Sequence, residues 1–554
     1  MQRFDYPKWT EDLLLQAMES FVGLVIMLSF VYTCISTVKV ITAEKEKQLK
    51  EAMKIMGLPG WLHWTAWFIK TFTFLLLSIT VMVILLKAKW YPGTDHTVFT
   101  NSNPFIIFIF LLLFICATIT FCFAVSVFFS KANTAATMAG LAWFLSYFPY
   151  SLMQQRYDDM SLAEKLLASL CSNTAMAYGF KLIITFEGID EGVQWHNIWK
   201  TTTPDDNLKL GYLMIMLAVD ALLYLLIAIY VEAIFPGEYG VPQPWYFPFT
   251  YSYWCGKPVE SLNIEEEPIE NEFYEKEPTH LQTGIKISHL RKEFSKKKVA
   301  VHDLSLNMYK DQITVLLGHN GAGKTTTMSM LTGMFPPSSG TAIIGGYDVR
   351  TEIVGVRESL GLCPQHNILF DELTVKEHLY FYSRLKGLTR QESQFEIDKY
   401  IELLELIPKA DSPSSTLSGG MKRKLSVAVA LCGGSSVVMC DEPTAGMDPA
   451  ARRALWDLLQ SQKKGRTILL TTHFMDEADL LGDRIAIMSG GRLQCCGSSF
   501  FLKKKYGAGY HLIMDKSKDC SVEKVTSLLQ KYIPEIEVNL VVFRNYHYIS
   551  FDIQ

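Results

Sequence analysis

The sequence predicts a multi-domain chain: an α-helical transmembrane bundle, then a P-loop α/β domain, then part of a small α+β module. Three observations support this fold class. Hydrophobic residues make up 49% of the 554 residues, and most of them lie in long apolar runs before residue 250. A glycine-rich loop then stands between a strand-like run at 313–317 and a helix-like run at 326–332. A β-α-β-β pattern ends the chain.

The predicted membrane domain covers residues 1–253. Five of its segments are apolar over about the 20 residues that a helix needs to cross a bilayer. They are 21–41, 62–86, 105–129, 133–153 and 210–234. The fourth segment carries small and polar residues, including Asn133, Thr137 and Ser146, which suit a helix packed inside a bundle. We therefore expect an integral, multi-pass membrane protein.

Three ionisable groups lie in or near these segments. Lys70 and Glu232 are close to segment ends, where a long side chain can reach the interface. Asp220 lies deeper, where an exposed charge costs at least about 2.5–3.5 kcal/mol, so it should face a partner or water. Two roles stay open for Asp220, namely a structural hydrogen bond or a place on a substrate path.

Two connecting segments also have helical features. In 43–56, Glu46 and Lys50 are spaced as an attractive pair. The apolar residues on one face of this helix are Leu49, Met53 and Met56. The helix could carry motion of the following domain to the membrane, or it could be an ordinary interfacial helix. Segment 161–185, interrupted at Asn173 and Gly179, predicts a helical hairpin dipping into the outer leaflet.

A phosphate-binding loop is the strongest motif of the domain predicted over 283–505. It fits G-x-x-x-x-G-K-[ST] between a strand and a helix, where backbone N–H groups and the helix N-terminus face phosphates. Lys324 would bridge the β and γ phosphates of ATP, and Thr325 would hold Mg²⁺. The expected nucleotide contacts are Gly318, His319, Asn320, Gly321, Ala322, Gly323, Lys324, Thr325 and Thr326. The flanking strand and helix argue against the alternative, a glycine turn that binds nothing.

Further polar residues follow this loop at the ends of apolar runs. Gln365 would contact Mg²⁺ and sense the attacking water. The strand-like run 437–442 ends in Asp441, which would hold Mg²⁺ through water, and Glu442, which would polarise the nucleophilic water. His473 ends the next apolar run and could contact the γ-phosphate. Each residue alone is more often structural, but their common order favours a catalytic ATPase.

This set resembles the nucleotide-binding domain of ABC transporters. In that family the Leu-Ser-Gly-Gly motif, here at 417–420, closes over ATP held by a second, facing domain. The resemblance implies such contacts from Ser418, Gly419 and Gly420. It also places Asp448 at the nucleotide, and it matches Phe294 to the aromatic residue that stacks on adenine, with a core phenylalanine as the alternative. Met421 departs from the family, whose motif usually ends in Gln.

Other segments are similar to subfamily A of these transporters, at 230–247, 363–366, 472–478 and 497–503. The resemblance implies ATP-powered movement of phospholipid or sterol by a protein with two membrane halves and two ATPase domains. The chain departs from it by lacking a first span, a large exofacial domain and the second half. Membrane lipids, and a second ABC half or an identical copy, are therefore the expected partners. Hydrolysis requires that second domain, because one domain cannot complete a composite site.

Charge and cysteine content exclude other classes. The net charge is −4 and no basic face dominates, so no nucleic-acid partner is expected. The 11 cysteines show no disulfide framework, and none has zinc-ligand spacing.

The orientation of the chain follows from its nucleotide site. An ATP site must be cytosolic, and counting back through five spans places the N-terminus outside. We therefore expect a missing upstream span, in a fragment or a short isoform, or else a first span that inserts unaided. The plasma membrane, an endolysosomal or lamellar membrane and the endoplasmic reticulum are not distinguished.

Two segments flank the predicted ATPase domain. Residues 254–282 form an acidic linker, with seven Glu between 263 and 278. Residues 506–554 form a partial regulatory module, with strands at 510–514, 537–543 and 546–553 and a helix at 522–532.

Two functions stay open. The first is one half of an ATP-driven lipid transporter that couples ATP hydrolysis at a two-domain site to lipid movement. The alternative is an ATP-binding short isoform or fragment without turnover, which assists or regulates full-length transporters.

Overall fold

The computed structural model describes most of the chain. The described residues are 13–89, 97–202, 206–236, 243–250, 273–278, 280–294, 298–507, 510–515, 521, 524, 526–528, 531, 537–543 and 546–553. Contacts divide the chain into two compact units. The helical unit comprises Met1–Lys54 and Leu58–Gly256, and the sheet unit comprises Ile55–Gly57 and Lys257–Gln554. Each unit is described by itself.

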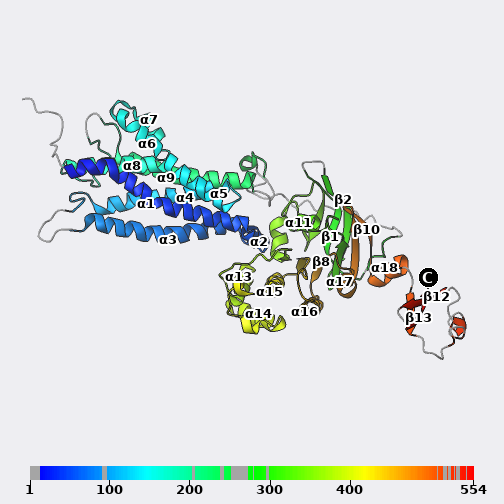
Figure 1. The fold of residues 1–554 in the computed structure, drawn as a ribbon. Helices are drawn as coiled ribbons and strands as arrows, with labels where there is room; N and C mark the ends of the chain where they lie inside the picture. The colour runs from blue at the N-terminus through cyan, green and yellow to red at the C-terminus, as the bar shows by residue number, and fades with distance from the viewer. Residues whose placement is uncertain are drawn as a thin grey trace, which may run out of the picture. The chain divides into compact units, whose positions relative to one another are not determined.

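Four long helices form the frame of the helical unit (Figure 1). They are α1 (Leu13–Glu46), α3 (Gly60–Lys87), α4 (Pro104–Val127) and α9 (Leu210–Ile234). Among the described residues these four helices are long and apolar enough to cross a membrane, and they coincide with four of the five predicted spans. The shorter helices are α2 (Leu49–Ile55), α5 (Ala132–Leu145), α6 (Phe148–Met153), η1 (Gln154–Asp159), α7 (Leu162–Ala168), α8 (Ser172–Gly188) and η2 (Phe247–Phe249).

The core helix of this unit is α4. In its most apolar stretch 67% of the residues are buried, against 17% in α3 and in α9. Its start is well defined, because Asn103 accepts a hydrogen bond from the backbone of Phe105, and Pro104 lies in the first turn, where no N–H is needed. Phe114 of α4 meets Phe30 of α1 edge-on at 5.4 Å. The outer faces of α3 and α9 stay apolar and exposed, as lipid contact requires.

The fourth predicted span, 133–153, is not one helix, which corrects that prediction. The chain forms α5, of 14 residues, and α6, of 6 residues, with a turn at Ser146 and Tyr147 between them. Pro149 has no N–H to donate to the carbonyl of Leu145, so the helical hydrogen-bond pattern is interrupted at this point. Each piece is shorter than the ~20 residues of a spanning helix.

Segment 161–185 is helical, and its break lies close to one of the two predicted interruptions. The helices α7 and α8 are separated at 169–171, close to Asn173, whereas Gly179 lies inside α8. A Cβ added at Gly179 would come within 2.1 Å of the Phe110 ring of α4. The glycine therefore serves close helix packing rather than a turn.

Segment 43–56 is also divided. Helix α1 continues to Glu46, and the chain turns at Gln48, with φ 59°, before α2 begins. The apolar residues of the predicted face, Leu49, Met53 and Met56, are buried. The expected pair of Glu46 with Lys50 is not formed, because the turn breaks the helical spacing. Instead Glu46 accepts a hydrogen bond from the backbone of Ala132 at 2.8 Å.

The two acidic residues of α9 have opposite surroundings. Asp220 is 0% exposed, and among the described residues neither of its carboxylate oxygens has a hydrogen-bond partner. The expected structural hydrogen bond is therefore not found there. Glu232, expected to reach the interface, lies 2.7 Å from Lys50 Nζ and 3.1 Å from Lys54 Nζ, and it accepts from Trp64 Nε1 at 2.7 Å.

The sheet unit is built on a ten-stranded sheet, in the order β5-β4-β1-β2-β10-β9-β3-β8-β7-β6. The bounds are β1 (Thr283–Phe294), β2 (Lys298–Tyr309), β3 (Ile313–Gly318), β4 (Ser339–Ile344), β5 (Tyr347–Asp348), β6 (Leu360–Cys363), β7 (Val437–Asp441), β8 (Thr467–Thr472), β9 (Arg484–Ser489) and β10 (Arg492–Gly497). Strands β9, β3, β8, β7 and β6 pair in parallel, whereas β2, β1, β4 and β5 pair antiparallel.

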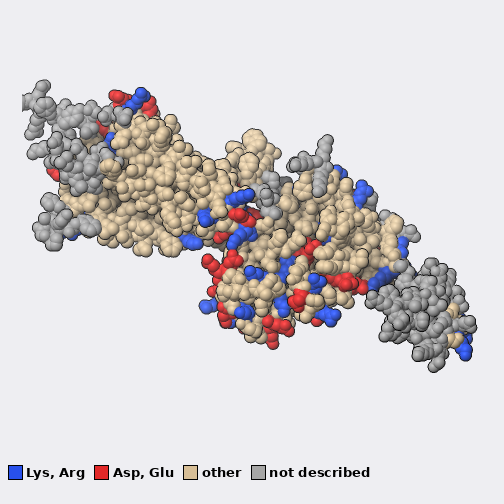
Figure 2. Space-filling view, viewed as in Figure 1, with Lys and Arg blue, Asp and Glu red and all other residues tan. Residues whose placement is uncertain are grey.

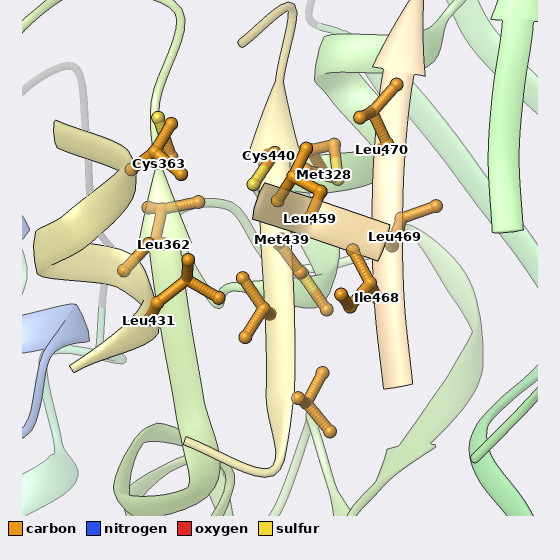
Figure 3. Close-up of a cluster of buried hydrophobic side chains, with 14 of the residues drawn as sticks. Met328, Leu362, Cys363, Leu431, Met439, Cys440, Leu459, Ile468, Leu469 and Leu470 are labelled. Carbon is orange, nitrogen blue, oxygen red and sulfur yellow. The ribbon is translucent and has the colours of Figure 1, made fainter. Parts of the chain in front are cut away.

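The parallel strands form the core of this unit. Every residue of β7 and β8 is buried, which explains why these strands are continuous apolar runs without alternation. In Figure 3, Met439 and Cys440 of β7 lie between β6 and β8 among apolar side chains. Leu317 of β3 is level with Thr472 of β8, and Asp441 of β7 is level with Thr471. The carboxyl ends of three strands therefore meet at one edge, where the predicted site residues lie.

Helices cover this sheet and extend beyond it. They are α11 (Lys324–Leu331), α12 (Ile353–Ser359), α13 (Val375–Leu385), α14 (Arg390–Leu403), η3 (Ile407–Lys409), η4 (Ser414–Thr416), α15 (Gly419–Leu431), α16 (Pro449–Ser461), α17 (Met475–Leu481) and α18 (Ser499–Tyr506). The three strands predicted near the C-terminus form an antiparallel sheet, β11-β13-β12, with bounds Tyr510–Asp515, Tyr546–Ile553 and Glu537–Phe543. Most of the predicted helix 522–532, and residues 254–272 of the acidic linker, lie outside the described residues.

Candidate active site

The phosphate-binding loop connects β3 to α11, as its motif requires. Gly321 and Gly323 have φ values of 82° and 105°, which only glycine adopts readily, and Gly323 is the N-cap of α11. A Cβ at Gly323 would also come within 2.8 Å of the carbonyl oxygen of Ala300. The loop therefore needs these glycines to present its backbone N–H groups.

Lys324 is held over this loop. Its Nζ donates to the carbonyl oxygens of Gly318 at 2.5 Å and His319 at 3.2 Å. Burial lowers the pKa of Lys324 from its ordinary value, and the charges of Glu442 and Asp441 partly offset that effect. A phosphate entering the loop would supply the counter-charge that the ammonium lacks.

A cavity of about 540 Å³ opens in front of the loop. Its lining includes the predicted residues Phe294, Asn320, Gly321, Ala322, Gly323, Lys324, Thr325, Thr326, Gln365 and Glu442, and also Val299, Ala300, Gly490 and Gly491. Phe294 is 39% exposed at the end of β1, so it is a surface of the cavity rather than a core residue. The volume suits a nucleotide-sized ligand.

Glu442 lies at the centre of the predicted catalytic group. Its Oε1 is 3.2 Å from His473 Nδ1, and its Oε2 is 3.5 Å from Gln365 Nε2. Its backbone has φ 46°, an uncommon conformation for a side-chain-bearing residue, and its N–H donates to Thr471 O and Thr471 Oγ1, both at 3.1 Å. The fold therefore brings together the three residues predicted to be catalytic.

Asp441 provides the second carboxylate. Burial raises its pKa, while hydrogen bonds from the hydroxyls of Thr471 and Thr325 act in the opposite direction. The bond to Thr325 links the strand to the phosphate-binding loop. Thr325, Asp441 and Gln365 together offer only oxygen donors for a cation, and oxygen donors are the ligands that Mg²⁺ prefers.

The remaining predicted residues do not line this cavity. Ser418 is the N-cap of α15 and accepts from the backbone of Met421 at 3.3 Å. An added Cβ at Gly419 or Gly420 would meet nothing within 4 Å, so their backbone faces open space. Asp448 is the N-cap of α16 and accepts from the backbone of Ala451 at 3.1 Å. Contacts of these residues with a nucleotide stay predictions.

Two buried charged residues near the site were not predicted. Glu477 is 1% exposed and accepts from Thr444 Oγ1 at 2.9 Å and Thr472 Oγ1 at 2.5 Å, next to His473. Arg423 is 2% exposed and lies beside the segments that carry Gln365 and Glu442. A sequence signal existed for Arg423, because it is spaced i, i+4 and i+7 with the buried Val427 and Ala430.

Comparisons with known proteins agree with both units. Residues 301–445 match the family model described as ABC transporter, and residues 8–230 match the one described as ABC-2 family transporter protein. The human phospholipid-transporting ATPase ABCA3 is 51% identical over 96% of this chain, and the human ATP-binding cassette sub-family A member 2 is 48% identical over 93%. The chain spans 32% of the first relative and 22% of the second.

Proposed function

Because the chain belongs to the ABC transporters, with relatives in subfamily A, we propose that it is the ATP-hydrolysing half of a transmembrane lipid transporter. One observation carries the proposal. Gln365 and Glu442 line the same cavity as the loop of Lys324, and His473 contacts Glu442, while four helices among the described residues are long enough to span a membrane.

The residues divide the hydrolysis of ATP among them. Lys324 binds the β and γ phosphates and neutralises charge that develops on them. Glu442 accepts a hydrogen bond from the attacking water and increases its nucleophilicity, and His473 and Gln365 hold that carboxylate in place. Thr325, Asp441 and Gln365 would hold Mg²⁺, which supplies further charge neutralisation. Phe294 offers a ring face for the adenine base.

A second nucleotide-binding domain completes the site. Ser418, Gly419 and Gly420 lie outside the cavity of their own chain, and the open space at the two glycines permits the close approach of a nucleotide. We therefore propose that this segment covers ATP bound by a second ABC half or by a second copy of the chain. The α15 N-terminus adds a favourable dipole for the phosphates.

The proposed cargo is a membrane lipid, either a phospholipid or a sterol. The name of the 51% identical human relative states that it transports phospholipid. The helical unit supports this cargo, because α3 and α9 expose large apolar side chains, among them Phe74 and Leu77 at 67%. The nucleotide-binding domain then lies in the cytosol, where ATP is available.

Replacing Glu442 by Gln tests the proposal. The full chain in lipid nanodiscs should hydrolyse Mg-ATP, and Glu442→Gln should reduce turnover by about 10²–10³-fold while ATP still binds, because an amide is a poor general base. The control is Asp457→Asn, which also replaces a carboxylate by an amide but lies on α16, away from the cavity. Undiminished turnover in Glu442→Gln would contradict the assigned base. ATP binding without turnover in the unsubstituted chain would favour the alternative function, a non-hydrolysing partner of full-length transporters.

A further inference from the structure

Arg423 is the most extensively hydrogen-bonded buried cation among the described residues of the sheet unit. It lies in the second turn of α15, and its side chain is 2% exposed. No carboxylate is within ion-pair distance of its guanidinium among those residues, so its charge is balanced by other groups. Burying a cation in this way is costly unless each N–H finds an acceptor.

Its acceptors are almost all backbone carbonyls of two segments. From the segment after β6, Nη1 donates to Pro364 O at 2.5 Å and Gln365 O at 3.1 Å. At the end of β7 and just after it, Nη2 donates to Asp441 O at 2.5 Å and Glu442 O at 2.9 Å, and Nε donates to Pro443 O at 2.9 Å.

These two segments carry the side chains that must meet at the catalytic carboxylate. Gln365 Nε2 and Glu442 Oε2 are separated by 3.5 Å, although the residues are 77 positions apart in the chain. Strands β6 and β7 pair with each other only up to Cys363 and Cys440. Beyond that point Asp441 and Glu442 are bonded to Thr471 of β8, but no strand pairing joins them to Gln365. The guanidinium bridges the gap that the strand pairing leaves.

We infer that Arg423 is a positioning residue for the hydrolysis proposed above: it holds the backbone of Gln365 and of Glu442 at a fixed separation. A planar guanidinium with five N–H donors can serve both segments at once. A lysine ammonium, with three donors on one atom, reaches only part of this set. The expected effect of Arg423 on turnover rests on the proposed ATPase function. Its expected effect on the backbone of the two segments does not.

The kinetic test compares Arg423→Gln and Arg423→Lys in the full chain, in lipid nanodiscs. Both should lower kcat, Arg423→Gln by about 10²-fold, because displacements near 1 Å at a catalytic group have effects of that size. The affinity for trinitrophenyl-ATP should change less than about threefold, because the Lys324 loop is untouched. In a Glu442→Gln background, Arg423→Gln should cause no further loss, since Arg423 acts through that carboxylate. A parallel loss of affinity, or full additivity, would overturn the inference.

Hydrogen exchange gives a readout that does not depend on turnover. Arg423→Gln should raise amide exchange in 365–367 and at Glu442 and Thr444 while the strand β8 stays protected. Arg466→Gln is the matched control, because Arg466 also donates to a backbone carbonyl, that of Leu431 at 3.0 Å, but does not line the cavity. Unchanged exchange in both segments, or the same pattern in the control, would overturn the inference. An inactive unsubstituted chain with the expected exchange pattern would contradict only the proposed function.

Discussion

The two units solve the problem of buried charge in different ways. In the sheet unit, Arg423 and Glu477 are almost fully buried, and each has several hydrogen-bond partners. In the helical unit, Asp220 is equally buried, yet among the described residues its oxygens have no partner. Irregular segments supply free carbonyls beside Arg423, whereas the helices around Asp220 use their backbone groups internally. The free carbonyls of irregular segments therefore account for the difference between Arg423 and Asp220.

The units also differ in where they place apolar side chains. Every residue of β7 and β8 is buried, whereas Phe74 and Leu77 of α3 are 67% exposed. In Figure 2 the helical unit shows mostly uncharged residues between its charged ends, and the sheet unit shows Lys, Arg, Asp and Glu over much of its face. The same residue types are placed oppositely because lipid replaces water as the solvent of the helical unit.

The largest expected effect on stability comes from removing a buried, hydrogen-bonded carboxylate of the sheet unit. Glu477→Leu should lower the free energy of unfolding by about 3–5 kcal/mol, because it leaves buried donors of Thr444, Thr472 and Trp456 without an acceptor. Thermal unfolding of the full chain measures this loss. Glu402→Leu, at an exposed position of α14, should change the free energy by less than about 0.5 kcal/mol. Equal effects of the two substitutions would show that the Glu477 contacts do not stabilise the unit.

Smaller changes in stability, of opposite sign, are expected for the two acidic residues of α9. Glu232→Gln should destabilise the helical unit by about 2 kcal/mol, because Lys50 and Lys54 lose their counter-charge while Glu232 is only partly buried. Asp220→Asn should stabilise it by about 1 kcal/mol, because an amide cannot ionise and so removes the cost of a buried charge, although it gains no partner. The melting temperatures of the two variants and of the unsubstituted chain, measured in the same detergent, test both expectations. Destabilisation by Asp220→Asn would reveal a partner for the carboxyl.

The smallest effect concerns the pH dependence of the sheet unit. His378 Nε2 accepts from Phe370 N at 2.9 Å and Nδ1 lies 2.8 Å from Thr374 O, so the neutral ring is satisfied. Burial lowers the pKa of His378 below 6.5. The unfolded chain therefore takes up a proton first as the pH falls, and stability is lost below about pH 6.5 by at most about 1.4 kcal/mol per pH unit. Unfolding between pH 7.5 and 5.5 should show this slope, and His378→Gln should reduce it. An unchanged slope in the variant would assign it to other groups.

Local patterns were sufficient for much of the fold and for the centre of the site. The phosphate-binding loop, the strands that end at Asp441 and Thr472, and four long apolar helices all depend on short-range features, namely glycine conformations, apolar runs and helix length. The grouping of Glu442, His473 and Gln365 followed because parallel neighbouring strands end at one edge. The chain order of such motifs is enough to infer their chemistry.

Only the tertiary structure decided which long-range partners each polar group found. The sequence spacing predicted an ion pair between Glu46 and Lys50. Because the chain turns at Gln48, Glu46 instead accepts a hydrogen bond from the backbone N–H of Ala132. Apolar content predicted one span at 133–153, where a proline divides two short helices. The spacing of Arg423 with Val427 and Ala430 indicates only a buried position, and it says nothing of a role at the site, because the acceptors of Arg423 are backbone carbonyls, which every residue type provides. The sequence by itself determined most of the elements and the order of the motifs, because these depend on neighbours in the chain. Folding determined the contacts across the chain, because they depend on which segments meet in space.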